Sequence, residues 1–226
     1  MLAKQLAFDL QLRPALGRDD FLVTSSNSAA VALIDQWPNW QSHAAVLVGP
    51  PGSGKSHLAE VWRQVSGAGV VESGKVTVES VPDLMMTGAL VVEDLKPGLI
   101  EEHALFHLLN HARETGGHIL LTLQSWPLAG LVLPDLASRF NALTVAAILP
   151  PDDELLRGVL VKLFEDRQIA VDEALISYLV TRMPRSLDMA RQLVARIDAA
   201  ALEQGAEVTR VFAGKILAEL ESPDLL

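Results

Sequence analysis

The chain has 226 residues, half of them hydrophobic, and it contains no cysteine. This length and composition fit a globular fold with a sizeable core and room for a small second lobe, and they exclude a disulfide framework or a thiolate metal site. The formal net charge is -10, from 18 Lys and Arg against 28 Asp and Glu. Because proteins bind duplex DNA mainly by neutralising its phosphates, no direct sequence-specific DNA binding is expected of so acidic a chain.

Residues 1–20 contain a short alternation of apolar and polar residues, Gln5-Leu6-Ala7-Phe8-Asp9-Leu10, with Pro14 and Gly17 behind it. These breakers make the stretch a poor core strand, so an N-terminal arm outside the fold is expected. The stretch lacks the basic-then-apolar order of a secretory signal, and no apolar run in the chain approaches the ~20 residues of a membrane span. A cytoplasmic protein with no membrane contact is therefore the expectation.

The segment 21–38 begins with Phe21-Leu22-Val23 and continues with the polar cluster Thr24-Ser25-Ser26-Asn27-Ser28. Side chains of this kind accept hydrogen bonds from the free N–H groups of a first helical turn, so the cluster predicts a cap for a helix over 29–37. Pro38 is expected to end that helix.

The central motif follows an apolar run at 44–48 that predicts a buried strand. The next residues read Gly49-Pro50-Pro51-Gly52-Ser53-Gly54-Lys55-Ser56-His57, and a helix-like segment comes after them. A Gly, four residues and then Gly-Lys-Ser between a strand and a helix is the spacing of a P-loop. Glycines let backbone N–H groups surround phosphate oxygens, and the start of the helix directs its positive end at the same anion.

In such a loop Lys55 reaches the β- and γ-phosphates and the Ser56 hydroxyl ligates Mg²⁺. The alternative is a Gly-rich turn that only joins a strand to a helix, and it accounts for neither the Lys-Ser pair nor the spacing. The predicted cofactors are therefore ADP or ATP together with Mg²⁺.

Apolar runs alternate with helix-like segments as far as residue 148. The predicted strands are 44–48, 70–71, 89–92, 118–123 and 143–148, with 76–78 as a further extended piece and a helix over 101–115. This alternation predicts an α/β fold with a parallel five-stranded sheet and helices on both faces. From residue 152 onward only helical patterns occur, at 152–167, 172–182, 186–204 and 209–220, with Asp172, Ser186 and Thr209 as expected N-caps.

Two acids, Glu93 and Asp94, follow the apolar strand 89–92. In P-loop proteins the first acid in this place helps to hold Mg²⁺ and a following acid can activate the attacking water. Glu93 stands where Asp is usual and is one methylene longer, so weak or absent ATP turnover is expected. The alternative is a pair of acids that simply opens a loop.

The stretch Leu133-Pro134-Asp135-Leu136-Ala137-Ser138-Arg139-Phe140 lies just before the last strand. Together with the P-loop it resembles the AAA+ class, and within that class the DnaA family and its shorter, Hda-like members. The resemblance implies a P-loop AAA+ fold followed by a small all-helical lid. It also implies that Arg139 is an arginine finger that acts on a neighbouring subunit's ATP; the alternative is an ordinary salt-bridged surface arginine.

The same resemblance implies further site residues. Arg185, in Pro184-Arg185-Ser186-Leu187, matches the lid arginine that contacts the nucleotide, with Arg182 and Arg191 as fallbacks. Gln124 or Thr122 matches the polar contact that follows the fourth strand. Phe21-Leu22-Val23 with Asn27 is similar to the segment that packs on adenine.

The arm resembles the sliding-clamp-binding peptide of Hda-like proteins, in which Leu6, Phe8 and Leu10 enter an apolar groove while Gln5 hydrogen-bonds its rim. A disordered arm with chance alternation is the alternative. The expected organisation is an arm at 1–20, an AAA+ domain at 21–149 and a helical lid at 150–226. The expected partners are DnaA and the clamp, and a homodimer stays open.

These features favour a regulator of replication initiation that stimulates ATP hydrolysis by DnaA. Two other readings stay open at this point. One is an independent, helicase-loader-like AAA+ ATPase, and the other is a non-catalytic paralogue that binds DnaA.

Overall fold

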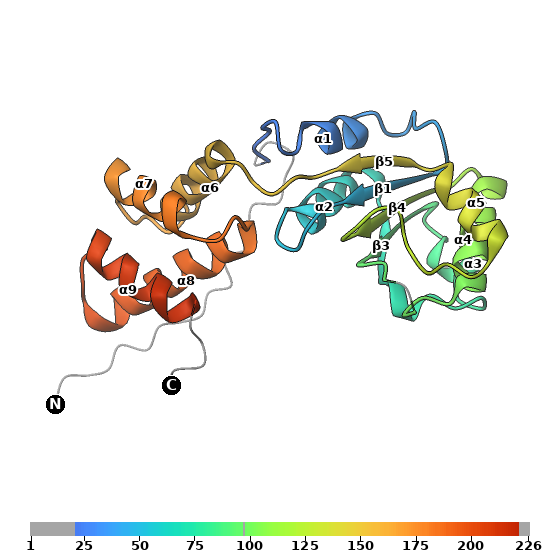
Figure 1. Cartoon of the computed structure of the whole chain (residues 1–226). Helices are drawn as coiled ribbons and strands as arrows, with labels where there is room; N and C mark the ends of the chain where they lie inside the picture. The colour runs from blue at the N-terminus through green and yellow to red at the C-terminus, as the bar shows by residue number, and fades with distance from the viewer. Residues whose placement is uncertain (1–20, 97, 222–226) are drawn as a thin grey trace. The chain divides into compact units, whose positions relative to one another are not determined.

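The protein is described by a computed structural model that covers residues 21–96 and 98–221. Its described residues divide into two compact units, an α/β unit at 21–152 and a helical unit at 153–221 (Figure 1). In the part of the chain that is described, no helix is both long and apolar enough to cross a membrane.

The α/β unit is built on one five-stranded sheet. Its strands are β1 (Ala44–Val48), β2 (Gly69–Glu72), β3 (Ala89–Glu93), β4 (His118–Leu123) and β5 (Thr144–Ala147). All neighbouring strands run parallel, in the order β2-β3-β4-β1-β5. This confirms the parallel five-stranded sheet that the alternation of strands and helices predicted.

Both faces of the sheet are covered, because the side chains of β1, β3 and β4 alternate between two apolar clusters. On β1, Ala44, Val46 and Val48 pack with one cluster, whereas Ala45 and Leu47 pack with the other. The first cluster takes its helical residues from α3 (Val81–Leu84), α4 (Glu102–Thr115) and α5 (Pro134–Asn141). The second takes them from α1 (Ser28–Asp35) and α2 (Lys55–Ser66), so α2 and α5 lie on opposite faces.

The predicted extended piece at 76–78 is wrong. These residues lie between a 3-10 turn, η2 (Ser73–Lys75), and α3. The Thr77 amide donates to the Ser80 hydroxyl at 3.0 Å, and the Ser80 hydroxyl donates to the Thr77 carbonyl at 2.9 Å. These local side-chain bonds satisfy backbone groups that a strand would have paired across the sheet.

The predicted cap of the first helix is also wrong. Helix α1 begins at Ser28, and Asn27 at its N-cap position makes no capping hydrogen bond. The Asn27 side chain instead accepts from the Thr24 amide at 2.9 Å and donates to the Leu22 carbonyl at 2.8 Å. The polar cluster therefore folds the loop before the helix rather than closing the helix end.

The helical unit has a core of its own. Its helices are α6 (Asp153–Glu165), α7 (Glu173–Arg182), α8 (Leu187–Gln204) and α9 (Arg210–Glu221). The three predicted N-caps are confirmed. The side chains of Asp172, Ser186 and Thr209 accept from backbone amides three residues ahead, at 2.7, 3.3 and 3.2 Å.

An aromatic cluster packs under the amino end of β4. Trp40 stacks on Trp62 with ring centroids 5.2 Å apart, and His118 meets the rings of Trp37 and Trp40 at 6.1 and 5.8 Å. Burial in this cluster lowers the pKa of His118, and the nearby charge of His43 lowers it further. The cluster therefore disfavours a charged imidazole in the folded state.

This pKa shift predicts a loss of stability in mild acid. Because the pKa of His118 is lower in the folded than in the unfolded chain, the unfolded chain binds the extra proton first, and stability falls as the pH drops below about 6.5. Urea unfolding at pH 7.5 and 5.5 should show a smaller pH dependence for His118→Gln than for the wild type. His103→Gln, at an exposed position of α4, is the matched control. An unchanged pH dependence in His118→Gln would contradict the assignment.

Candidate functional site

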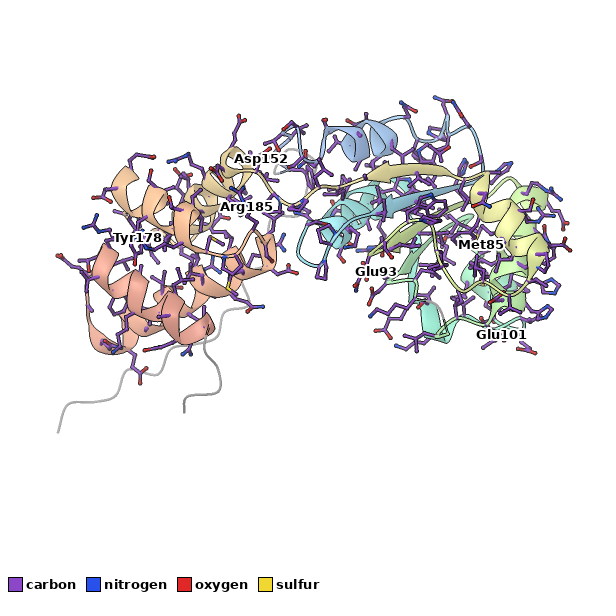
Figure 2. All side chains as sticks on the ribbon, viewed as in Figure 1. Met85, Glu93, Glu101, Asp152, Tyr178 and Arg185 are labelled. Atoms are coloured by element: carbon purple, nitrogen blue, oxygen red, sulfur yellow. The ribbon has the colours of Figure 1, made fainter. Side chains whose placement is uncertain are left out.

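Three of the candidate segments of the α/β unit lie at one edge of the sheet. The P-loop follows β1, Glu93 is the last residue of β3, and Gln124 follows β4 (Figure 2). Because β1 and β3 both pair in parallel with β4, the carboxyl ends of the three strands meet at this edge. Open parallel sheets bind their ligands at this edge.

The loop between β1 and α2 has the backbone of an anion cradle. Gly52 and Gly54 have φ angles of 68° and 103°, which residues with a Cβ adopt only with strain. Helix α2 begins at Lys55, directly after Gly54, with no side-chain cap bond and no acid in its first turn. The N–H groups of a first helical turn have no partners within the helix, so the start of α2 suits an anion.

Position 49 requires a glycine because a neighbouring backbone group leaves no room for a Cβ, and not because of the φ angle. A Cβ at this position would lie 2.4 Å from the Ile148 carbonyl oxygen and 2.9 Å from Ser53 Oγ. The Gly49 amide donates to the Leu123 carbonyl at 3.1 Å, and the Ile148 amide donates to the Val48 carbonyl at 2.7 Å. The root of the loop is thus held between the chain that leaves β4 and the chain that leaves β5.

Two side chains of the loop supply further donors. Lys55 Nζ donates to the carbonyl oxygens of Gly49 and Pro50 at 2.7 and 2.8 Å, so it lies across the loop. Ser53 is 3% exposed, and its hydroxyl has no hydrogen-bond partner among the described residues. A buried donor without a partner, an ammonium and a cradle with no room for a Cβ together fit a phosphate group.

Ser56 and Glu93 fit a magnesium ion by their chemistry. A hydroxyl and a carboxylate are oxygen ligands of the kind that Mg²⁺ prefers. Within the described residues, no group of three or more His, Asp or Glu residues could hold a metal. That Ser56 and Glu93 hold Mg²⁺ jointly with phosphate oxygens stays a prediction.

Asp94 begins the turn after β3, and its carboxylate is held from two sides. It accepts a hydrogen bond from Gln124 Nε2 at 3.2 Å and forms an ion pair with Lys96. The hydrogen bond from Lys96 lowers the pKa of Asp94; Gln124 and the charge of Lys55 act in the same direction, and partial burial opposes them. The motif analysis missed Lys96, although an opposite charge two residues beyond the acid was a visible signal.

Thr122 and Gln124 have different roles. Thr122 is buried, and its hydroxyl accepts from the Asp94 amide at 2.8 Å while its carbonyl accepts from the Leu95 amide at 2.8 Å. Gln124 is exposed, with its amide group at the Asp94 carboxylate. Thr122 thus fixes the turn after β3. Of the two candidates, only Gln124 has a side chain that a ligand can reach.

The segment expected to contact adenine likewise contains both buried structural residues and exposed residues. Phe21 is buried, and its ring lies edge-on to His57 of α2 with centroids 5.0 Å apart. Asn27 is buried within its own loop. Leu22 and Val23 are 38% and 48% exposed, so they alone of these four offer apolar surface to a ligand.

Arg139 lies on α5, and its guanidinium carbon is 4.9 Å from the centroid of the Phe106 ring on α4. No carboxylate of the described residues pairs with it. Glu102, one turn before Phe106, accepts from the amides of Val132 and Leu133 at 2.9 and 2.6 Å and so fixes the approach to α5. The guanidinium therefore rests on a neutral ring, with its charge not neutralised by an acid.

The three arginines expected from the lid belong to the helical unit. Arg185 pairs with Asp153 at 2.6 Å, Arg191 pairs with Asp188 at 2.9 Å, and Arg182 lies over the Tyr178 ring at 4.3 Å. Figure 2 labels Arg185 and Tyr178 in this unit. The role of Arg185 at a nucleotide stays a prediction. Gln5, Leu6, Phe8 and Leu10 lie outside the described residues.

Comparison with solved structures establishes the fold. Domain III of DnaA from Thermotoga maritima superposes with a TM-score of 0.76 at 20% identity, over 91% of this chain and 97% of that one. AMPPCP-bound DnaA from Aquifex aeolicus gives 0.68 at 19% identity, over 95% and 71% of the two chains. The chain has the AAA+ fold. RuvB, the Holliday junction branch migration motor of Thermotoga maritima, gives 0.70 at 15% identity, over 90% and 72%.

Comparison of sequences gives distant relatives. The chain is 24% identical over 238 residues to the chromosomal replication initiator DnaA of Campylobacter curvus and 26% identical over 239 residues to that of Wolinella succinogenes. Each match covers 92% of this chain, which spans about half, 53%, of each relative. No protein-family model matches the chain.

The contact at Gly49 predicts the effect of adding a single methyl group. Gly49→Ala should shift the loop root, destabilise the protein by ~1–3 kcal/mol and weaken ADP binding at least about tenfold. Gly74→Ala is the matched control, because a Cβ there meets only the Leu99 carbonyl, at 3.6 Å. Calorimetric titration and thermal melting give both quantities. Equal values for Gly49→Ala and the wild type would contradict the tight contact.

Proposed function

We propose that this chain is an Hda-like regulator of replication initiation that binds ADP or ATP with Mg²⁺ and stimulates ATP hydrolysis by DnaA. The supporting observation is Arg139: it lies on a helix that packs against the opposite face of the sheet from α2, and no described carboxylate neutralises it. An arginine in this position is better suited to a phosphate on another subunit than to the nucleotide of its own P-loop.

The proposed chemistry follows from the charge that develops in phosphoryl transfer. Water attacks the γ-phosphorus of ATP on DnaA, the bond to the ADP oxygen breaks, and negative charge spreads over the transferred group. A guanidinium brought in from a second subunit stabilises that charge, and such fingers are worth about 10³–10⁵ in rate. The Phe106 ring favours this task, because it supports the guanidinium without the neutralising charge of an acid.

The remaining residues receive supporting roles in this proposal. The P-loop holds the phosphates, and Ser56 and Glu93 together bind the Mg²⁺. Asp94 and Gln124 lie beside the attacking water. Leu22 and Val23 pack on the base, while Phe21 and Asn27 support that segment. Arg185 serves as the lid contact of the 150–226 domain, and the arm at 1–20 docks on the sliding clamp of the polymerase.

A second candidate function is an independent AAA+ ATPase of the helicase-loader type. The observation that favours it is that Lys55 and Ser56 of the P-loop occur in the same chain as the acids Glu93 and Asp94. These four residues could bind the phosphates, the Mg²⁺ and the attacking water for hydrolysis in cis. Phosphate release at a robust rate without DnaA would support this reading. A non-catalytic paralogue that binds DnaA would leave DnaA hydrolysis unchanged.

The main proposal predicts a selective loss in Arg139→Ala. This variant should keep ADP affinity and thermal stability but reduce the stimulation of DnaA hydrolysis by at least about 10³-fold, since the finger's charge is lost. The measurement is phosphate release from preloaded DnaA-ATP at matched clamp occupancy. Arg113→Ala, at an exposed position of α4, is the control. Undiminished release with Arg139→Ala would rule out this residue as the finger.

The proposed tether predicts a different selective loss. Replacing Gln5, Leu6 and Phe8 by Ala removes one polar and two apolar anchors of the arm, so clamp binding should fall well over tenfold. ADP affinity should stay at the wild-type value, because these residues precede the P-loop domain. Binding to immobilised clamp measures the first quantity and calorimetry the second. If the triple variant binds the clamp as tightly as the wild type does, the apolar alternation in this segment is a chance pattern.

A further inference from the structure

The turn after β3 contains an ion pair that the proposed function does not use. We infer that Lys96 is a positioning residue that holds the Asp94 carboxylate and thereby keeps the chain's own ATP hydrolysis slow. This inference rests on the proposed binding of ATP at the P-loop. It gives a physical reason for a protein that stimulates hydrolysis on a partner while turning over little nucleotide itself.

The backbone around Asp94 is fixed by neighbouring elements. Asp94 has a φ angle of 52°, in the left-handed region, and its amide donates to Thr122 Oγ1 at 2.8 Å. Its carbonyl accepts from the Ser73 hydroxyl at 3.1 Å, and the amide of the buried Leu95 donates to the Thr122 carbonyl at 2.8 Å. The backbone that carries the carboxylate therefore cannot easily turn, and the side chain has few directions open to it.

Two donors then hold the carboxylate itself. Gln124 Nε2 donates to Oδ1 from the loop after β4, and the Lys96 ammonium pairs with Oδ2 from the same turn as Asp94. One donor therefore occupies each oxygen. The carboxylate is held in one rotamer, between an amide and a cation.

Hydrolysis in cis needs this carboxylate for another task. The water oxygen bonds to the γ-phosphorus while the bond from that phosphorus to the ADP oxygen breaks, the electron pair leaves with ADP, and the carboxylate receives the water's proton. A water placed for attack needs an oxygen of Asp94 as its acceptor. The Lys96 ammonium competes for that oxygen and lowers the basicity of the carboxylate, so its departure would favour the chemistry without being required for it.

The ion pair is weak enough to be reversible. The side chains of Lys96 and Asp94 are 44% and 49% exposed, so the lysine can leave without unpacking the core. Exposed pairs contribute little free energy, which limits the effect of the lysine on turnover to about two- to fivefold. The inference therefore predicts a restraint on turnover rather than a complete block.

The test is the steady-state release of phosphate by the full chain, without DnaA. Lys96→Met removes the charge and keeps most of the length, so kcat should rise about two- to fivefold while KM and ADP affinity stay level. Lys96→Arg restores a cation and should return kcat to the wild-type value. Lys75→Met is the matched control, since Lys75 forms an exposed pair with Glu72 at 3.0 Å in the same unit.

A double variant tests whether the gain passes through the carboxylate. Lys96→Met combined with Asp94→Asn should lose the gain, because no carboxylate remains to be released. A kcat for Lys96→Met that equals or falls below the wild-type value overturns the inference, as does a gain that survives in the double variant. Absence of nucleotide binding by the wild type in calorimetry would instead remove the proposed function together with the inference.

Discussion

The architecture of the site depends on one backbone contact, between the Ile148 carbonyl and Gly49. No Cβ fits between them, and the Gly49 amide is tied to Leu123 on the other side. The loop root is therefore fixed by the chain that leaves β4 and the chain that leaves β5, which flank β1. This fixation places the start of α2, and with it Lys55 and the N–H groups of the first turn, at the carboxyl edge of the sheet. A phosphate-binding loop needs such rigidity, because its backbone donors must converge on one anion without the cost of ordering them at binding.

The same edge carries a second fixed turn, and there the rigid element is Thr122. Its hydroxyl and carbonyl hold the amides of Asp94 and Leu95, so the acids after β3 keep a set position relative to β4. The backbone of Asp94 thus has little freedom of its own. What remains adjustable is the long, half-exposed side chain of Lys96. The arrangement combines a fixed backbone with one exposed ion pair, which is the feature that the inferred role of Lys96 requires.

Arg139 and Lys96 are both cations at the surface, and they differ in whether an acid neutralises their charge. Lys96 forms an ion pair with Asp94, an acid of its own site, so its charge is neutralised there. Arg139 rests on the Phe106 ring, on the face of the sheet away from α2, and its charge is directed at no described acid. A cation over an aromatic ring keeps its hydrogen-bonding edge for another molecule, whereas an ion-paired cation does not. In the proposed function, this difference would separate hydrolysis on a partner from hydrolysis in cis.

The sequence by itself determined the elements whose signals are local. The apolar runs predicted the parallel sheet, the Gly and Lys-Ser spacing predicted the loop, and Asp172, Ser186 and Thr209 predicted their helix starts, because a cap bond reaches only three residues ahead. Only the tertiary structure decided that Asn27 folds its own loop and that Thr77 and Ser80 replace a strand with a turn. It alone also paired Arg139 with Phe106, Asp94 with Gln124, and Gly49 with Ile148. These three contacts join residues 30 or more positions apart, and their partners are set by the order of the strands, which no local pattern encodes. The bonds of Asn27, Thr77 and Ser80 span only three to five residues, but there a side chain competes with the helix or strand for the same backbone groups.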